Sequence, residues 1–188
     1  MLKMNGLKSL TPLGHAAPET TVIGRFTIVE RVDVALASLA TRRGRDADVA
    51  AAAASLGLPL PGPGRHETGA LAAFWLSPDM WMVEAPFATH EDIRAHLLAA
   101  FADAASITEQ TDAWVRFDLT SDCLPGLMER LSNVDLTRAT DGAATRTVID
   151  HLGCYLIRRS ATEITLYGPR SSAETLHHAL GVAAVSLG

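Results

Sequence analysis

Two short segments of the chain place a carboxylate two residues before an indole. The pairs are Asp79 with Trp81 and Asp112 with Trp114, each just before or inside a run of strand-forming residues. Side chains of these types can bind and stack on a pterin or a flavin. They also suit a structural role, in which the carboxylate accepts backbone N–H groups and the indole fills a core. We interpret all four as structural and predict no catalytic residue.

The histidines offer two further candidates for chemistry. His177 and His178 form the densest cluster, but neighbours on a helix point about 100° apart and need ligands from elsewhere to hold one metal ion. His151 follows Asp150, and a histidine beside a carboxylate can act as a general base. No nucleophile motif accompanies this pair, however. We predict a surface or interface pair at His177 and His178, a solvated turn at His151, and no metal site.

Motifs for nucleotides and acyl transfer are missing from the sequence. The richest glycine segment, residues 62–69, carries Pro63 inside the loop and has no helix after it, so it does not match the dinucleotide fingerprint. No phosphate-binding loop and no nucleophile elbow occur either. We therefore predict no cofactor-binding residue. Cys123 and Cys154 lack metal-site spacing and are expected to be free buried thiols.

Composition narrows the class of protein. The chain has 188 residues, a net charge of −5 and 48% hydrophobic residues, as expected for a globular protein. Acidic and basic residues are mixed, so there is no basic face for nucleic acid. No apolar run approaches the roughly 20 residues of a membrane span. We expect a cytoplasmic protein that binds neither nucleic acid nor membrane.

The elements that must position these residues follow from periodicity and turn signals. Residues 1–24 are broken by prolines and glycines and are expected to form an irregular arm, which orders only against something else. Helices are expected at 49–56, ended by Gly57, from the cap at Thr89 to about 103, at 124–131, and after a capping box at 171–174. Strands are expected at 25–34, 35–42, 70–76, 81–84, 107–109, 113–119, 144–149, 154–158 and 163–167.

This order of elements predicts an α+β fold with antiparallel sheets and helices packed on one face. The segment 35–42 is expected to be the hairpin partner of 25–34, with a short helix as the alternative. We predict a single domain over 25–188, made of two similar halves that meet near residue 104. Such a duplication would explain why Asp-x-Trp occurs twice.

Six segments, in order, carry a family resemblance that covers the chain from about Phe26 onward. They are GLPLP at 57–61, LSPDMWMV at 76–83, TEQTDAW at 108–114, LSNVDL at 131–136, GAATRT at 142–147 and RSSAETL at 170–176. Together they resemble the gamma subunit of heterotetrameric sarcosine oxidase. One departure is Ser77, where a glycine is expected. The family is similar in fold to the folate-binding domain of aminomethyltransferases such as the glycine cleavage T-protein.

The resemblance implies a subunit of an alpha–beta–gamma–delta complex that oxidatively demethylates sarcosine to glycine. The one-carbon unit passes to tetrahydrofolate or leaves as formaldehyde, and hydrogen peroxide is released. The resemblance places FAD, FMN and NAD on the alpha and beta subunits and zinc on delta, and assigns no redox centre to gamma. It therefore implies an isolated chain that is inactive. The alternative is a stand-alone folate-binding or one-carbon transfer module.

Overall fold

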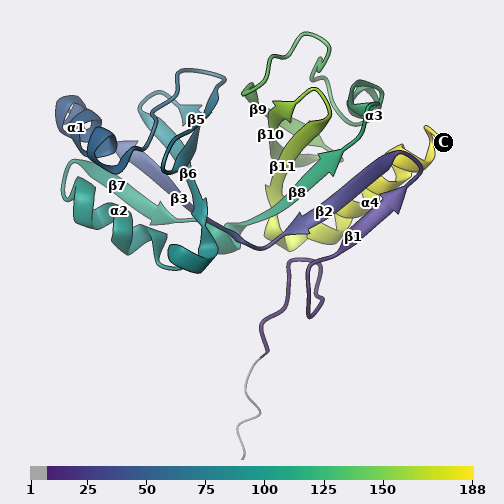
Figure 1. Cartoon of the computed structure of the whole chain (residues 1–188), viewed down its shortest axis with the longest axis horizontal. Coiled ribbons are helices and arrows are strands. Elements are labelled where there is room, and N and C mark those ends of the chain that lie inside the picture. The colour runs from purple at the N-terminus through teal and green to yellow at the C-terminus, as the bar shows by residue number, and fades with distance from the viewer. Residues whose placement is uncertain (1–7) are drawn as a thin grey trace, which may run out of the picture.

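The structure is a computed structural model that describes residues 8–188, and it contains two antiparallel sheets and four α-helices (Figure 1). The six-stranded sheet runs, in spatial order, β1 (Thr20–Ile23), β2 (Phe26–Arg31), β8 (Trp114–Thr120), β11 (Glu163–Pro169), β10 (Leu152–Ser160) and β9 (Ala144–Ile149). The five-stranded sheet runs β4 (His66–Thr68), β5 (Ala72–Ser77), β6 (Met80–Pro86), β3 (Val34–Thr41) and β7 (Ala105–Glu109). The helices are α1 (Asp46–Leu56), α2 (Ile93–Phe101), α3 (Leu124–Leu131) and α4 (Ala173–Val185).

Each sheet packs one face against two helices and turns its other face toward the second sheet. Alternation along β3 produces this arrangement: Ala35, Ala37 and Leu39 join the core under α1 and α2, whereas Leu36 joins a core shared by both sheets. A third core lies between the six-stranded sheet, α3 and α4. In Figure 1 the two sheets stand side by side with α1 and α2 on the outer side of the five-stranded sheet. The predicted α+β fold is confirmed.

The order of elements repeats within the chain. The series β2-β3-α1-β4-β5-β6-α2 is followed by β7-β8-α3-β9-β10-β11-α4. Strand pairing repeats in register as well, because Pro86 pairs with Val34 in one sheet and Pro169 with Trp114 in the other. The first strand of each series, however, lies in the other half's sheet: β2 pairs with β8, and β7 pairs with β3. The chain thus consists of two similar halves that exchange one strand.

The repeat does not explain the two Asp-x-Trp segments. Trp81 lies near the start of β6, whose counterpart in the second half is β11. Trp114 begins β8, whose counterpart in the first half is β3. The two segments therefore occupy different places in the two halves, and the explanation by duplication was wrong.

Three local predictions also need correction. β2 and β3 are not hairpin partners but lie in different sheets, since the short connection at Val32 and Asp33 crosses from one sheet to the other. The predicted cap at Thr89 lies in a 3-10 turn, η1 (Phe87–Thr89), and Asp92 caps α2 instead by accepting a hydrogen bond from the Ala95 N–H at 2.9 Å. At the start of α4 the predicted capping box is absent, because η3 (Arg170–Ser172) leads directly into the helix.

The arm predicted over residues 1–24 is ordered against its own chain where the structure describes it; its first seven residues lie outside the described range. The Leu13 side chain is only 6% exposed and belongs to the core under α3 and α4. Buried Glu30 on β2 accepts the backbone N–H of Leu13 at 2.9 Å and that of Glu19 at 3.1 Å. Strand β1 then forms a hairpin with β2 around Gly24, so the predicted boundary at residue 24 falls inside a turn.

No helix of residues 8–188 has the length and apolar character that crossing a membrane requires.

Candidate functional site

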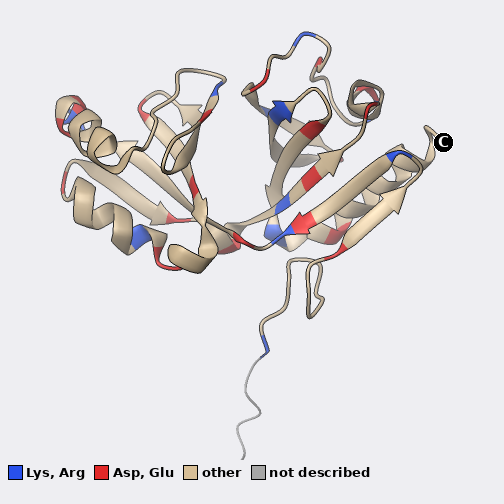
Figure 2. Ribbon diagram, viewed as in Figure 1, with Lys and Arg blue, Asp and Glu red and all other residues tan. Residues whose placement is uncertain are grey.

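Charged side chains lie in the interior of the protein as well as on its surface. Figure 2 shows acidic residues on strands β2 and β8 as well as in the loops. Glu30, Glu84 and Asp118 are all buried. Because a buried carboxylate is costly without partners, each needs a local set of donors.

Glu84 on β6 lies at the centre of an ionic network between the two sheets. Its side chain is 5% exposed. Arg159 on β10 donates to Oε1 at 2.8 Å, Tyr167 on β11 donates its hydroxyl to the same oxygen, and Arg116 on β8 lies 3.5 Å from it. His66 on β4 has its Nε2 2.8 Å from Oε2. The network therefore joins strands from both halves of the chain.

Glu84 and Tyr167 occupy equivalent positions in the two halves, two residues before Pro86 and Pro169. They face one another across the junction of the halves. Equivalent positions of the two halves therefore meet. At this point one half supplies a carboxylate and the other a phenol.

The charges around Glu84 control its ionisation. Burial alone would raise the pKa of the Glu84 carboxyl, but the hydrogen bond with His66 and the charges of Arg159 and Arg116 outweigh burial and hold the pKa well below its usual range. Burial, together with the charge of Glu84, raises the pKa of Tyr167 well above its ordinary value. Glu84 is therefore ionised and Tyr167 is a neutral donor at neutral pH.

The Nε2 atom of His66 lies within hydrogen-bonding distance of two partners, but it can form a hydrogen bond with only one of them at a time. It lies 2.8 Å from Glu84 Oε2 and 2.6 Å from Arg159 Nη1. A single ring nitrogen cannot donate to the carboxylate and accept from the guanidinium at once. The ring therefore serves one partner at a time.

Asp118, on β8, extends the network away from Glu84. Its two carboxylate oxygens accept a two-pronged pair of hydrogen bonds from Arg116 at 2.8 and 2.9 Å, and one oxygen also accepts the Thr165 hydroxyl at 2.6 Å. Arg31 on β2 lies 3.6 Å from the same carboxylate. Arg116 thus bridges the two buried carboxylates.

The network is complete within the described part of the chain. There, no buried side-chain nitrogen or oxygen lacks a hydrogen-bond partner. Residues 8–188 also hold no group of three histidine, cysteine or acidic side chains arranged for a metal ion. Because its polar atoms satisfy one another, the network serves to fasten the two halves together.

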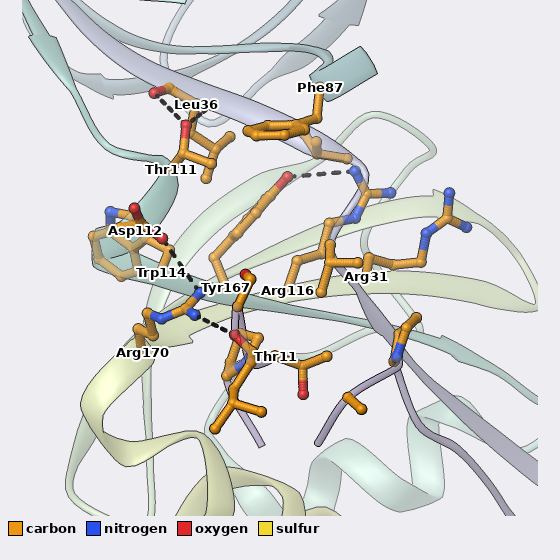
Figure 3. Close-up of a pocket in the computed structure, with 17 residues that line it drawn as sticks. Thr11, Arg31, Leu36, Phe87, Thr111, Asp112, Trp114, Arg116, Tyr167 and Arg170 are labelled. Carbon is orange, nitrogen blue, oxygen red and sulfur yellow. Dashed lines mark hydrogen bonds and ion pairs between the residues drawn. The ribbon is translucent and has the colours of Figure 1, made fainter. Parts of the chain in front are cut away.

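A cavity of about 300 Å³ lies beside this network, where the two connections between the sheets pass each other (Figure 3). The arm forms one wall, and the other walls come from the start of β3, η1, the η2–β8 segment and the end of β11. The lining residues are Ser9, Leu10, Thr11, Pro12, Ala16, Pro18, Arg31, Val32, Val34, Leu36, Phe87, Thr111, Asp112, Trp114, Arg116, Tyr167 and Arg170.

The cavity brings together two of the four residues singled out in the sequence. Asp112, in η2 (Thr111–Ala113), is exposed and lies 3.5 Å from the guanidinium of Arg170. Trp114 is half-buried, packs edge-on against Tyr155 and donates its indole N–H to Gln110 at 3.3 Å. Both line the cavity.

The other two residues lie elsewhere. Asp79 is exposed in the β5–β6 turn with a positive φ of 59°, and its main-chain carbonyl, not its carboxylate, accepts the Thr41 N–H. Within residues 8–188, neither Asp79 nor Asp112 accepts a backbone N–H through its carboxylate, which differs from the expected role. Trp81 packs against the core under α1 and α2 and donates its indole N–H to the Pro61 carbonyl at 2.8 Å.

These surroundings predict different costs for removing the two indoles. Trp81→Ala is expected to lower the free energy of unfolding by about 3–5 kcal/mol, because it leaves a void against the core and an unpaired Pro61 carbonyl. Trp114→Ala is expected to cost less, since one side of the ring already faces a cavity. Urea denaturation of both variants measures the difference, and a larger loss for Trp114→Ala would contradict this assignment.

The two cysteines are free, as expected from the sequence. Cys154 is buried in the core under α4, and burial raises the pKa of its thiol to about 11. Cys123 is half-buried at the start of α3. The raised pKa keeps Cys154 in the inert thiol form at neutral pH.

Sequence reasoning missed the ionic network. The one signal for Glu84 is a charge between two apolar residues, Val83 and Ala85, at the end of a predicted strand. Arg116 and Asp118 give a similar signal, because they alternate with the buried Val115, Phe117 and Leu119 on β8. An alternating charged face on an inner strand indicates ionic partners on a second layer.

Comparison with known proteins identifies the fold. No family profile matches the sequence, and no curated protein matches it. Among solved structures, a chain of heterotetrameric sarcosine oxidase from Corynebacterium sp. U-96, in complex with pyrrole 2-carboxylate, matches with a TM-score of 0.75 and 19% identity over 89% of this chain and 88% of that one. The glycine cleavage system aminomethyltransferase T from Bartonella henselae matches with a TM-score of 0.62 and 12% identity over 83% of this chain and 48% of that one. The chain thus has the fold shared by these two structures.

Proposed function

We propose that this chain is the non-catalytic gamma subunit of a flavin-dependent sarcosine oxidase complex. The observation that carries the proposal is the fold match to a chain of heterotetrameric sarcosine oxidase. The match takes in close to nine-tenths of both chains, so the two are similar in length and the likeness extends over the whole unit. The six sequence segments that resemble the gamma subunit support the same assignment.

In this proposal the complex demethylates sarcosine to glycine in the cytoplasm and contains alpha, beta and delta subunits as partners. FAD, FMN, NAD, zinc and tetrahydrofolate bind those partners rather than this chain. The self-contained ionic network supports a scaffolding role, because its buried polar groups are already satisfied by one another. The absence of a dinucleotide fingerprint in the sequence agrees with this division of labour.

The alternative function, a stand-alone folate-binding or one-carbon transfer module, rests on the likeness to the aminomethyltransferase. The chain spans 48% of that enzyme's length. The cavity of about 300 Å³ also stands at the lower end of the range for drug-sized ligands, which is about 300–1,000 Å³. These two observations favour the subunit role.

Co-expression tests the proposal directly. With alpha and beta subunits of a sarcosine oxidase, the chain is expected to co-purify as one complex that oxidises sarcosine. The chain purified alone is expected to be colourless and inactive toward sarcosine, because the flavins belong to its partners. Elution of the chain apart from the other subunits at micromolar concentration would overturn the assignment.

Calorimetric titration of the isolated chain with tetrahydrofolate separates the two functions. The subunit role predicts no saturable heat. Stoichiometric binding of tetrahydrofolate would favour the one-carbon module instead.

A further inference from the structure

The cavity beside the ionic network has an unbalanced set of charges in its walls. Three arginines, Arg31, Arg116 and Arg170, line it, whereas Asp112 is the one acidic residue in the lining. The carboxylates that pair most closely with Arg31 and Arg116 are Asp33, Asp118 and Glu84, and none of them lines this cavity. The guanidinium groups border the cavity, while most of the carboxylates that balance them lie outside its lining, so an anion in the cavity would meet hydrogen-bond donors first.

The arginines differ in how firmly they are held. Arg116 is engaged by two buried carboxylates. Arg170 instead donates to the Leu10 carbonyl at 3.1 Å and lies 3.5 Å from Asp112, whose side chain is 87% exposed. An exposed and distant partner is weakly held, since solvent screens the pair. Arg170 is thus the cation best placed to exchange a carboxylate.

Three aromatic residues are also part of the lining. Phe87, Trp114 and Tyr167 come from three different segments and border the same space (Figure 3). Rings arranged in this way favour a flat apolar body between them. A cavity of about 300 Å³ is larger than a bare phosphate or acetate requires, and its lining includes apolar side chains such as Leu10 and Leu36 that such an ion would leave without contacts.

We infer that this cavity binds a small planar carboxylic acid, about the size of benzoate, with its carboxylate on Arg170 and its ring against Phe87 and Trp114, next to the buried Tyr167. The arm segment 9–18 forms the outer wall and covers the ligand. This inference goes beyond the subunit role and does not depend on it, because it is argued from residues of this chain alone.

The test uses the full chain labelled with ¹⁵N and benzoate as the probe. Trp114 carries one of three indole N–H groups, each with its own NMR signal, and Trp81 serves as the internal control. Benzoate is expected to shift the Trp114 signal saturably, with a Kd of about 10 mM or tighter for a ligand of this size. Acetate, which lacks the ring, and benzyl alcohol, which lacks the charge, are expected to bind at least about tenfold more weakly.

Two substitutions with opposite expected effects on benzoate affinity test where the carboxylate of the ligand binds. Arg170→Gln is expected to weaken benzoate binding by about tenfold or more, because it removes a charge-assisted hydrogen bond. Asp112→Asn is expected to strengthen binding, because it removes the carboxylate that competes for Arg170. Arg45→Gln, on the far side of the first half beside Asp48 and Asp103, is the matched control and is expected to leave binding unchanged.

Three results would overturn the inference: no saturable shift of the Trp114 signal, equal binding of benzoate and benzyl alcohol, or unchanged benzoate affinity in Arg170→Gln. Melting curves of each variant verify that it is folded, and a gain of affinity in Asp112→Asn cannot arise from unfolding. Co-purification with partner subunits plays no part in these outcomes, so this inference and the proposed function fail separately.

Discussion

Glu84→Ala is expected to lower the free energy of unfolding by about 3–5 kcal/mol, because removing one partner leaves buried cations without their counter-charge. Arg159 loses its 2.8 Å carboxylate partner, and the Tyr167 hydroxyl loses its acceptor. Urea denaturation at neutral pH measures the effect. Glu67→Ala is the matched control, since Glu67 is an exposed glutamate on β4 of the same sheet, and a loss no greater than that of the control would contradict the role of the network.

The lowered pKa of Glu84 also predicts how the stability of the protein depends on pH. The pKa of Glu84 in the folded state lies below the ordinary value of 4.5. The unfolded state therefore binds the proton more readily, and the stabilisation from Glu84 is complete above about pH 4.5 and declines as the pH falls below it. Glu84→Gln is expected to flatten this acid-side decline in urea midpoints, and an unaltered pH profile in that variant would exclude Glu84 as its source.

Deletion of residues 1–24 is expected to destabilise the isolated chain by about 3 kcal/mol or more. The deletion removes the buried Leu13 side chain, worth about 1.5–3 kcal/mol, and also removes β1 and the donors to Glu30. Thermal unfolding of the chain alone measures the effect. An arm that ordered only against a partner, as its composition predicts, would affect assembly more than the melting temperature of the free chain when deleted.

Two point substitutions test whether the buried side chain of the arm stabilises the free chain. Leu13→Ala is expected to lower the melting temperature, because this side chain is 6% exposed, whereas Leu10→Ala is expected to change it little, because Leu10 is 52% exposed. Equal effects of the two substitutions, or a melting temperature unchanged by the deletion, would show that the arm does not stabilise the free chain.

Much of the local structure could be predicted from the sequence because it depends on local signals. The alanine-rich helix ends at Gly57, which adopts the expected left-handed conformation with φ of 60°. What could not be predicted were β1 and β4, which are only four and three residues long and carry no full period of alternation. The crossing between β2 and β3 was also missed, since a tight connection of two residues usually joins hairpin partners.

The candidate site was less predictable than the fold for a physical reason. Glu84 and Arg159 are 75 residues apart, and His66 and Arg159 are 93 apart, so only the meeting of the two sheets brings them together. Asp112 and Trp114 drew attention by their types, and they do line the cavity. Arg170, the cationic partner of Asp112, comes from a distant part of the chain, and no spacing rule connects the two residues.

The exchange of strands between the halves means that the repeat is not a pair of separable modules. β2 is an inner strand of the second half's sheet, whereas β7 forms the edge of the first half's sheet. A break between α2 and β7 would leave each half with a strand that belongs to its neighbour. Each half is therefore part of the template on which the other folds, much as in a dimer whose subunits have traded arms and then been joined into one polypeptide.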